Sequence, residues 1–84
     1  MGASTYQFMS DQKEFDALAV FCSKYEPATT TNVTDYFSSL EIQQIVAKHT
    51  GVTLPLTELH NMLVQMKYNY QLEDDEFKWL TLQQ

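Results

Sequence analysis

The residues whose side chains can take part in chemistry are few and scattered along the chain. His49 and His60 are eleven positions apart, and neither has a second ligand at metal-binding spacing. The single cysteine, Cys22, has no basic neighbour beyond Lys24 to activate it, so a small core residue is expected there. No glycine-rich phosphate loop, triad or nucleophile elbow occurs. The sequence therefore predicts a protein that is not an enzyme and has no catalytic, metal-binding or cofactor-binding residues.

The densest cluster of ionisable groups is an acidic run over residues 73–76, Glu-Asp-Asp-Glu. Carboxylate oxygens are calcium ligands, but the run lacks the glycine and the twelve-residue spacing of an EF-hand loop. We interpret it as a solvated turn. Four carboxylates at the tip of a hairpin would also repel a phosphate backbone.

The overall charge also argues against binding of nucleic acid. Eleven acidic residues against five lysines give a net charge of −6, and the chain contains no arginine. Arginine supplies the forked donors that grip phosphates and read guanine edges. Nucleic acid is therefore a disfavoured partner.

The length and composition fit one small folded domain. The chain has 84 residues, of which 44% are hydrophobic and 13% aromatic. One cysteine allows no internal disulfide, which suits a reducing compartment. No stretch approaches the roughly 18 consecutive apolar residues of a membrane span, and the N-terminus lacks the layout of a signal peptide. We expect a cytoplasmic protein with no membrane contact and no small-molecule substrate.

The first elements are an arm and a helix. We predict a flexible arm or a short strand over residues 1–10 and a single domain over residues 11–84. Residues 11–26 predict a helix, which Pro27 ends. Its apolar stripe consists of Phe15, Leu18, Ala19, Cys22 and Tyr25.

The middle of the chain predicts a short strand and two helices. After a polar connector over residues 28–34, a short strand passes through Tyr36 and Phe37. Ser38 and Glu41 form a capping box for a helix from Ser39 to His49, closed by Gly51. Its expected buried face is Ile42, Ile45 and Val46.

A third helix has Pro55 in its first turn. Its expected core stripe consists of Leu56, Leu59, Leu63 and Met66, with Met62 at the margin. The short spacing between this helix and the preceding one predicts a helix-turn-helix.

The C-terminal stretch predicts a hairpin. Tyr68, Tyr70 and Leu72 alternate with polar residues before the acidic loop, and a four-residue loop sets Leu72 opposite Phe77 and Tyr70 opposite Trp79. The predicted fold is therefore α+β: a small winged helix with three helices, a short strand before the second helix and a C-terminal β-hairpin wing.

The stretch from Tyr36 to Leu82 resembles the small winged-helix module of VirE-like, primase-associated proteins of Bacteroidetes mobile elements. Residues 36–42 look like that module's entry into its second helix, residues 56–63 like its third helix, and residues 77–80 like its returning wing strand. The resemblance implies a bacterial protein and a nucleic-acid role. The chain departs from the pattern where the family carries a basic run and a glycine, because four acids follow residues 68–71 here. His60 also replaces a glycine or alanine.

Two sets of residues are candidates for binding a partner. The exposed face of the third, recognition-type helix is predicted to be Thr57, Glu58, Asn61, Gln65 and Lys67. The aromatic residues exceed what a small core encloses, and surplus aromatic side chains are typical of interfaces. The candidate partner contacts are Tyr6, Phe8, Tyr68, Tyr70 and Trp79.

These features favour a non-catalytic interaction module that binds a protein partner or forms a homodimer. The alternative is a nucleic-acid-binding accessory or regulator of a mobile element, an analogy from the fold. An acidic decoy that occupies another protein's DNA site is a third hypothesis.

Overall fold

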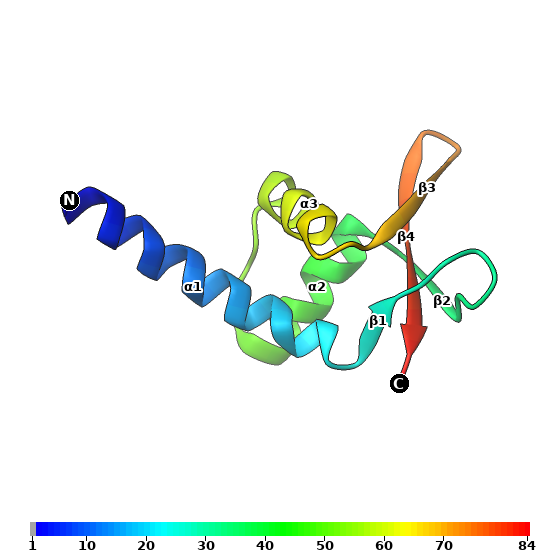
Figure 1. The fold of residues 1–84 in the computed structure, drawn as a ribbon, viewed down its shortest axis with the longest axis horizontal. Coiled ribbons are helices and arrows are strands. Elements are labelled where there is room, and N and C mark those ends of the chain that lie inside the picture. Colours follow the sequence, from blue (N-terminus) through cyan, green and yellow to red (C-terminus); the bar gives the residue numbers. More distant parts are fainter. Residues whose placement is uncertain (1) are drawn as a thin grey trace.

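The structure is a computed structural model that describes the backbone of residues 2–84 and the side chains of residues 12–84. It contains three helices and a four-stranded antiparallel sheet (Figure 1). The helices are α1 (Gly2–Cys22), α2 (Ser39–Thr50) and α3 (Leu56–Gln65). The strands are β1 (Tyr25–Pro27), β2 (Asp35–Ser38), β3 (Asn69–Glu73) and β4 (Glu76–Gln83). The prediction of a small α+β domain with a C-terminal hairpin is confirmed.

Helix α1 differs from its prediction at both ends. It begins at Gly2, whereas the sequence predicted an arm or a short strand over residues 1–10, so no strand forms in residues 2–10. It ends at Cys22, and residues 25–27 form β1 instead of a last helical turn. Pro27 therefore lies in a strand, where its fixed φ is compatible with extended backbone.

The buried face of α1 is also rotated from the predicted stripe. Ala17, Leu18 and Phe21 are buried, Phe15 and Cys22 are partly buried, and Ala19 is exposed. Spacings of three and four residues also relate Ala17, Leu18 and Phe21, so periodicity alone did not distinguish the two faces.

Helix α2 matches its prediction closely. The amide of Ser38 donates to Glu41 Oε1 at 2.8 Å, and the amide of Glu41 donates to Ser38 Oγ at 3.1 Å, which completes the capping box. Gly51 ends the helix with φ +76°, in the left-handed region that glycine adopts without steric cost. Ile42 and Val46 are buried, and Ile45 is partly buried.

Helix α3 begins one residue later than predicted, with Pro55 at its N-cap. Leu59, Met62 and Leu63 are buried, and Met66 packs against them. Leu56, which was predicted to belong to the core stripe, is 45% exposed. Its position in the first turn carries it beyond the end of the core.

The hairpin register is as predicted, but its turn is tighter. Leu72 pairs with Phe77 and Tyr70 pairs with Trp79. Glu73 also pairs with Glu76, so only Asp74 and Asp75 form the turn in place of the predicted four-residue loop. Their φ angles are +53° and +63°, as a type I′ turn requires, and this turn matches the twist of the flanking strands.

Strand β4 is the centre of the sheet, because each of the other strands pairs with it. Residues 78–80 pair with both β2 and β3, so these two strands lie on opposite edges of β4. Thr81 pairs with both Pro27 of β1 and Asp35 of β2, so β1 shares the edge of β3. The sequence predicted a two-stranded wing with a short strand before α2, and it missed β1.

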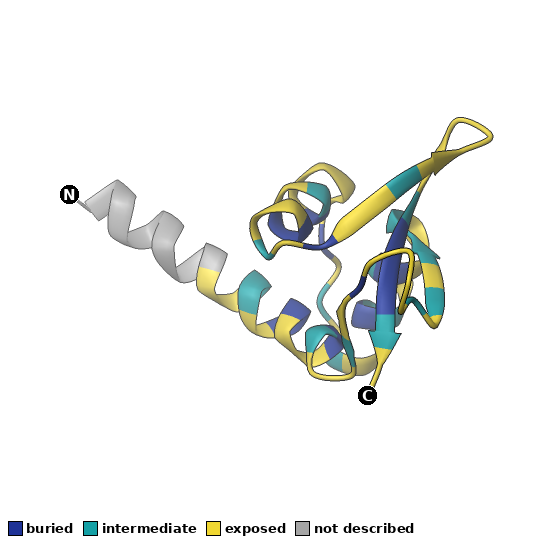
Figure 2. Cartoon of the chain, turned by 45° about the vertical axis from the view of Figure 1, so that its right-hand side comes forward, coloured by how far each residue is buried: buried dark blue, intermediate teal, exposed yellow. Residues whose placement is uncertain are grey.

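The core lies between the helices and one face of the sheet (Figure 2). Trp79, Leu18, Ile42, Leu59 and Leu63 are fully buried. Leu80 lies on the opposite face of β4 from Trp79, since successive side chains alternate, and it is also buried. Ala28, whose amide donates to the Leu80 carbonyl at 3.2 Å, is buried as well.

The capping box predicts the effect of removing its hydroxyl. We expect Ser38→Ala to lower the free energy of unfolding by about 1 kcal/mol, because the amide of Glu41 loses its acceptor. Urea unfolding followed by circular dichroism would measure this change. Ser23→Ala is the control, since its exposed hydroxyl donates only to the Val20 carbonyl after α1. An equal loss in both variants would contradict the role of the capping box.

The hairpin turn predicts a stabilising change. Replacing Asp74 by Asn and Asp75 by Gly is expected to stabilise the domain by up to about 1 kcal/mol, because these residues accept positive φ more readily. Thermal unfolding at high salt, which screens the loss of two charges, would isolate the backbone effect. A lower melting temperature at high salt would contradict the turn assignment.

Candidate interaction surface

The exposed apolar side chains gather on one part of the molecule. Eight large hydrophobic residues among residues 12–84 are exposed, and only Val20 and Tyr36 lie elsewhere. The other six come from the first turn of α2, from α3 and from the hairpin. We call these six the wing surface: Leu40, Leu56, Val64, Tyr70, Leu72 and Phe77.

A group of aromatic rings joins the hairpin to α3 at the base of the wing surface. The His60 ring centroid lies 5.5 Å from that of Phe77 and 5.2 Å from that of Trp79. Tyr70 contacts Phe77 edge-to-face at 5.0 Å and Trp79 at 5.2 Å. Edge-to-face contacts of this kind are favourable because the positive ring edge meets the negative ring face. The rings therefore hold the hairpin at a defined angle to α3.

Helix α3 presents two different apolar faces. Leu59, Met62 and Leu63 point into the core. Leu56, His60 and Val64 are spaced by four residues, so they share another face. His60 is half-buried against the hairpin rings, whereas Leu56 and Val64 are 45% and 46% exposed. This second face adjoins the hairpin through His60.

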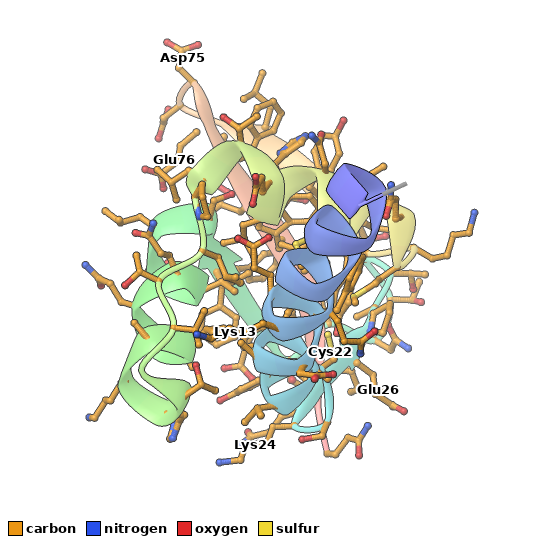
Figure 3. All side chains as sticks on the ribbon, turned by 90° about the vertical axis from the view of Figure 1, so that its left-hand side faces the viewer. Lys13, Cys22, Lys24, Glu26, Asp75 and Glu76 are labelled. Atoms are coloured by element: carbon orange, nitrogen blue, oxygen red, sulfur yellow. The ribbon has the colours of Figure 1, made fainter. Side chains whose placement is uncertain are left out.

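The hairpin tip adds negative charge to the edge of the wing surface. Glu73, Asp74, Asp75 and Glu76 are all exposed. Asp75 lies at the outer end of the hairpin, with its carboxylate directed away from the helices (Figure 3). A shallow depression beside the tip is lined by Ser38, Ser39, Leu40, Asp75, Glu76 and Phe77. The surface is therefore apolar at its centre and acidic at its tip.

One lysine offsets part of this charge. The ammonium of Lys78 lies 2.8 Å from Glu76 Oε1 and 3.9 Å from Glu41 Oε1. The hydrogen bond to Glu76 raises the pKa of the Lys78 ammonium. Lys78 follows Phe77 in β4 and so points to the opposite face of the sheet. Lys78 forms ion pairs with these two carboxylates. The carboxylates of Glu73, Asp74 and Asp75 remain to make the tip of the wing surface acidic.

The predicted partner contacts lie in different environments in the structure, one exposed and two buried. Tyr70 is 46% exposed and belongs to the wing surface. Tyr68 and Trp79 are 5% and 0% exposed, so they are core residues, and their prediction as surface contacts is wrong. Both have hydrogen-bond acceptors: the Tyr68 hydroxyl donates to the Tyr25 carbonyl, and Trp79 Nε1 donates to Ser39 Oγ at 2.9 Å. The side chains of Tyr6 and Phe8 lie outside the described residues.

The predicted recognition face is exposed but does not face the hairpin. All five of its residues are exposed: Thr57, Glu58, Asn61, Gln65 and Lys67. Glu58, Asn61 and Gln65 line a shallow groove on the side of α1, together with Glu14, Phe15 and Met62. Lys67 follows α3 with φ +71°. This face is polar and contains as many acids as lysines.

Of the six residues of the wing surface, the sequence predicted only Tyr70 as a contact, and it did not predict the packing of His60 on the hairpin rings. A usable signal was present, because Leu56, His60 and Val64 recur at intervals of four as a second stripe on α3. Leu72 and Phe77 were correctly predicted to pair, yet their exposure depends on how far the hairpin extends beyond the helices. That length is a property of the whole sheet.

The remaining chemistry-bearing residues lie apart. Among the described residues, no group of three or more His, Cys, Asp or Glu side chains is arranged to hold a metal ion. Cys22 Sγ lies 3.7 Å from Met66 Sδ at the edge of the core, and burial raises the pKa of its thiol.

In residues 2–84, no helix is long and apolar enough to cross a membrane. Comparison of the chain with protein-family models, curated proteins and solved structures finds no match.

The buried Tyr68 hydroxyl and the partly buried Cys22 thiol predict how the stability of the domain changes at high pH. Burial raises the pKa of both Cys22 and Tyr68 above their unfolded values of 9.0 and 10.0. The unfolded chain therefore loses these protons first as the pH rises, and the folded state loses stability above about pH 9. Below pH 9 the neutral forms predominate in both states, so the full stability remains.

Urea unfolding between pH 7 and pH 11 would measure this effect. We expect Tyr68→Phe, which keeps the ring, to reduce the loss of stability at high pH. Tyr36→Phe is the matched control, because Tyr36 is 47% exposed. An unchanged pH dependence in Tyr68→Phe would contradict the prediction.

Proposed function

We propose that this chain is a non-catalytic interaction module of winged-helix type, and that it binds another protein through the wing surface. The observation that carries the proposal is the gathering of six exposed large apolar side chains on α2, α3 and the hairpin. Contiguous exposed apolar side chains bordered by polar groups are typical of protein interaction sites.

The order of the elements supports the winged-helix part of the proposal. A short strand precedes α2, a brief connection joins α2 to α3, and a hairpin follows α3. The strand before α2 pairs with the return strand of that hairpin. In DNA-binding winged helices the third helix and the wing face the nucleic acid. In this chain the corresponding face of α3 is polar with one acid and one lysine, and the hairpin is apolar with an acidic tip.

The charge of the wing surface favours a particular kind of partner. Four carboxylates surround the hairpin turn, and Lys78, the lysine nearest to it in sequence, forms ion pairs with Glu76 and Glu41. Complementary potentials steer partners together and disfavour partners of like charge. The partner segment proposed here is therefore apolar with basic residues beside it.

The first test asks whether DNA binds at all. We expect no change in fluorescence anisotropy when the protein is titrated into labelled duplex or single-stranded DNA at low salt, where electrostatic affinity is strongest. Lys67→Glu serves as the control, because Lys67 is the lysine closest to α3. Micromolar binding that weakens with added salt and with Lys67→Glu would replace the proposal by the nucleic-acid alternative.

The second test measures the wing surface directly. A partner identified by cross-linking in the source cells would be purified, and its Kd measured by calorimetry. We expect Leu72→Ser to weaken binding by about tenfold, which corresponds to about 1.4 kcal/mol, because Leu72 is the most exposed residue of the surface at 62%. Tyr36→Ser removes an exposed apolar side chain outside the surface and is expected to leave Kd unchanged. Equal Kd values for wild type and Leu72→Ser would overturn the proposal.

A further inference from the structure

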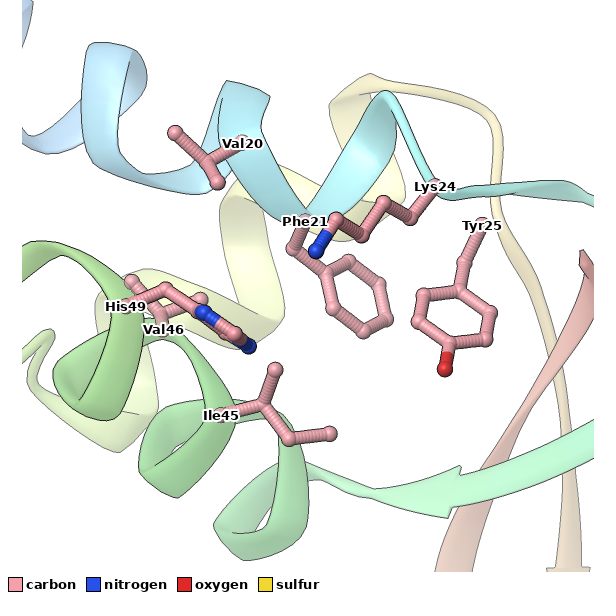
Figure 4. A pocket seen from close by; sticks show the side chains of 7 residues that line it. All are labelled: Val20, Phe21, Lys24, Tyr25, Ile45, Val46 and His49. Atoms are coloured by element: carbon pink, nitrogen blue, oxygen red, sulfur yellow. The ribbon is translucent and has the colours of Figure 1, made fainter. Parts of the chain in front are cut away.

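A pocket of about 160 Å³ lies between the end of α1 and the C-terminal half of α2. It shares no lining residue with the wing surface. Its walls are the side chains of Val20, Phe21, Lys24, Tyr25, Ile45, Val46 and His49 (Figure 4). The proposed function does not use this pocket.

The floor and walls of the pocket are apolar. Phe21 and Tyr25 stack with their ring centroids 5.0 Å apart and form one side. Ile45 and Val46 of α2 form the other side, and Val20 of α1 is 39% exposed at the edge. A ring or a branched aliphatic group placed here exchanges water for apolar contacts on two sides.

The rim of the pocket carries two basic side chains, and Tyr25 adds a hydroxyl to the lining. Lys24 follows α1 in a turn closed by a bond from its amide to the Phe21 carbonyl at 3.0 Å. Its side chain extends over Phe21 toward His49 (Figure 4). The ammonium of Lys24 and the imidazole of His49 are the two basic groups that line the pocket, and no carboxylate lines it.

The size of the pocket limits what it can bind. A cavity of about 150 Å³ lined by apolar side chains holds one benzene molecule. Pockets for drug-sized ligands are larger, at about 300–1,000 Å³. With about 160 Å³, this pocket has room for a single six-membered ring or a branched chain of similar volume.

We propose that this pocket binds an apolar group that carries a carboxylate, with the apolar group between Phe21 and Ile45 and the carboxylate at Lys24 and His49. The apolar walls alone would accept any ring of the right size. The donors at the rim select an anionic one, because a charged acceptor forms the stronger hydrogen bond with an ammonium. Two sources present this chemistry: a small free aryl or alkyl carboxylate, and the C-terminal residue of a peptide.

The proposal is tested with three probes that share one ring. Nitrogen-15 correlation spectra of the full chain would be recorded during titration with 3-phenylpropanoate, N-acetylphenylalanine and N-acetylphenylalanine amide. The two carboxylates are expected to cause saturable shifts at residues 20–25 and 45–49. The neutral amide should bind about two- to fivefold more weakly, as expected for one partly exposed charge interaction. Tighter binding of N-acetylphenylalanine would assign the peptide C-terminus as the source, and tighter binding of 3-phenylpropanoate the free acid.

Two substitutions separate the rim from the walls. Lys24→Gln is expected to remove the preference for the carboxylates. Lys48→Gln makes the same charge change in the neighbouring groove and is expected to keep the preference. Val20→Phe, at an exposed position of α1, fills the pocket and should abolish binding of all three probes. Equal affinities for the three probes in the wild type, or shifts that do not saturate, would overturn the proposal.

Discussion

The position of Trp79 determines how the helices and the sheet fit together. Its side chain is fully buried, and its Nε1 donates to Ser39 Oγ at the start of α2. Its ring also contacts His60 of α3 and Tyr70 of β3. Because Trp79 lies in β4, which pairs with every other strand, one side chain links the central strand to two helices. Removing the ring would leave a large cavity where three elements meet, which is among the costliest changes a core can undergo.

The wing surface follows from the same arrangement. Trp79 fixes the base of the hairpin against α3, and the strands continue past the helices toward the turn at Asp74 and Asp75. On the helix-facing side of the hairpin, exposure rises toward the turn in each strand. In β4 it rises from 0% at Trp79 to 42% at Phe77, and in β3 from 46% at Tyr70 to 62% at Leu72. The alternation of a strand requires apolar residues on this side near the core, but nothing in the described residues covers the outer ones. Their apolar character is thus not explained by the fold alone.

Local signals in the sequence predicted local structure well. The capping box, the glycine at the end of α2 and the hairpin pairs each depend on residues a few positions apart, and the structure confirms them. The sequence could not show that residues 25–27 leave the helix to pair with residues 81–83, since that pairing joins segments that are far apart in the chain. The same limit applied to burial. The sequence predicted Tyr68 and Trp79 as surface aromatic residues, but both are buried in the core. Leu56 was predicted to be buried, but it is 45% exposed.

Charge and apolar exposure together restrict the partners of this chain more than either does alone. An apolar patch without charge is promiscuous, because burial of apolar area is not directional. Acidic residues at the hairpin tip add a penalty for every partner that presents phosphates or carboxylates at this edge, and discrimination often relies on such repulsion. The absence of arginine in the whole chain removes the forked donors that would compensate for it. The proposed function therefore combines a winged-helix arrangement with a surface that is apolar at its centre and acidic at its tip.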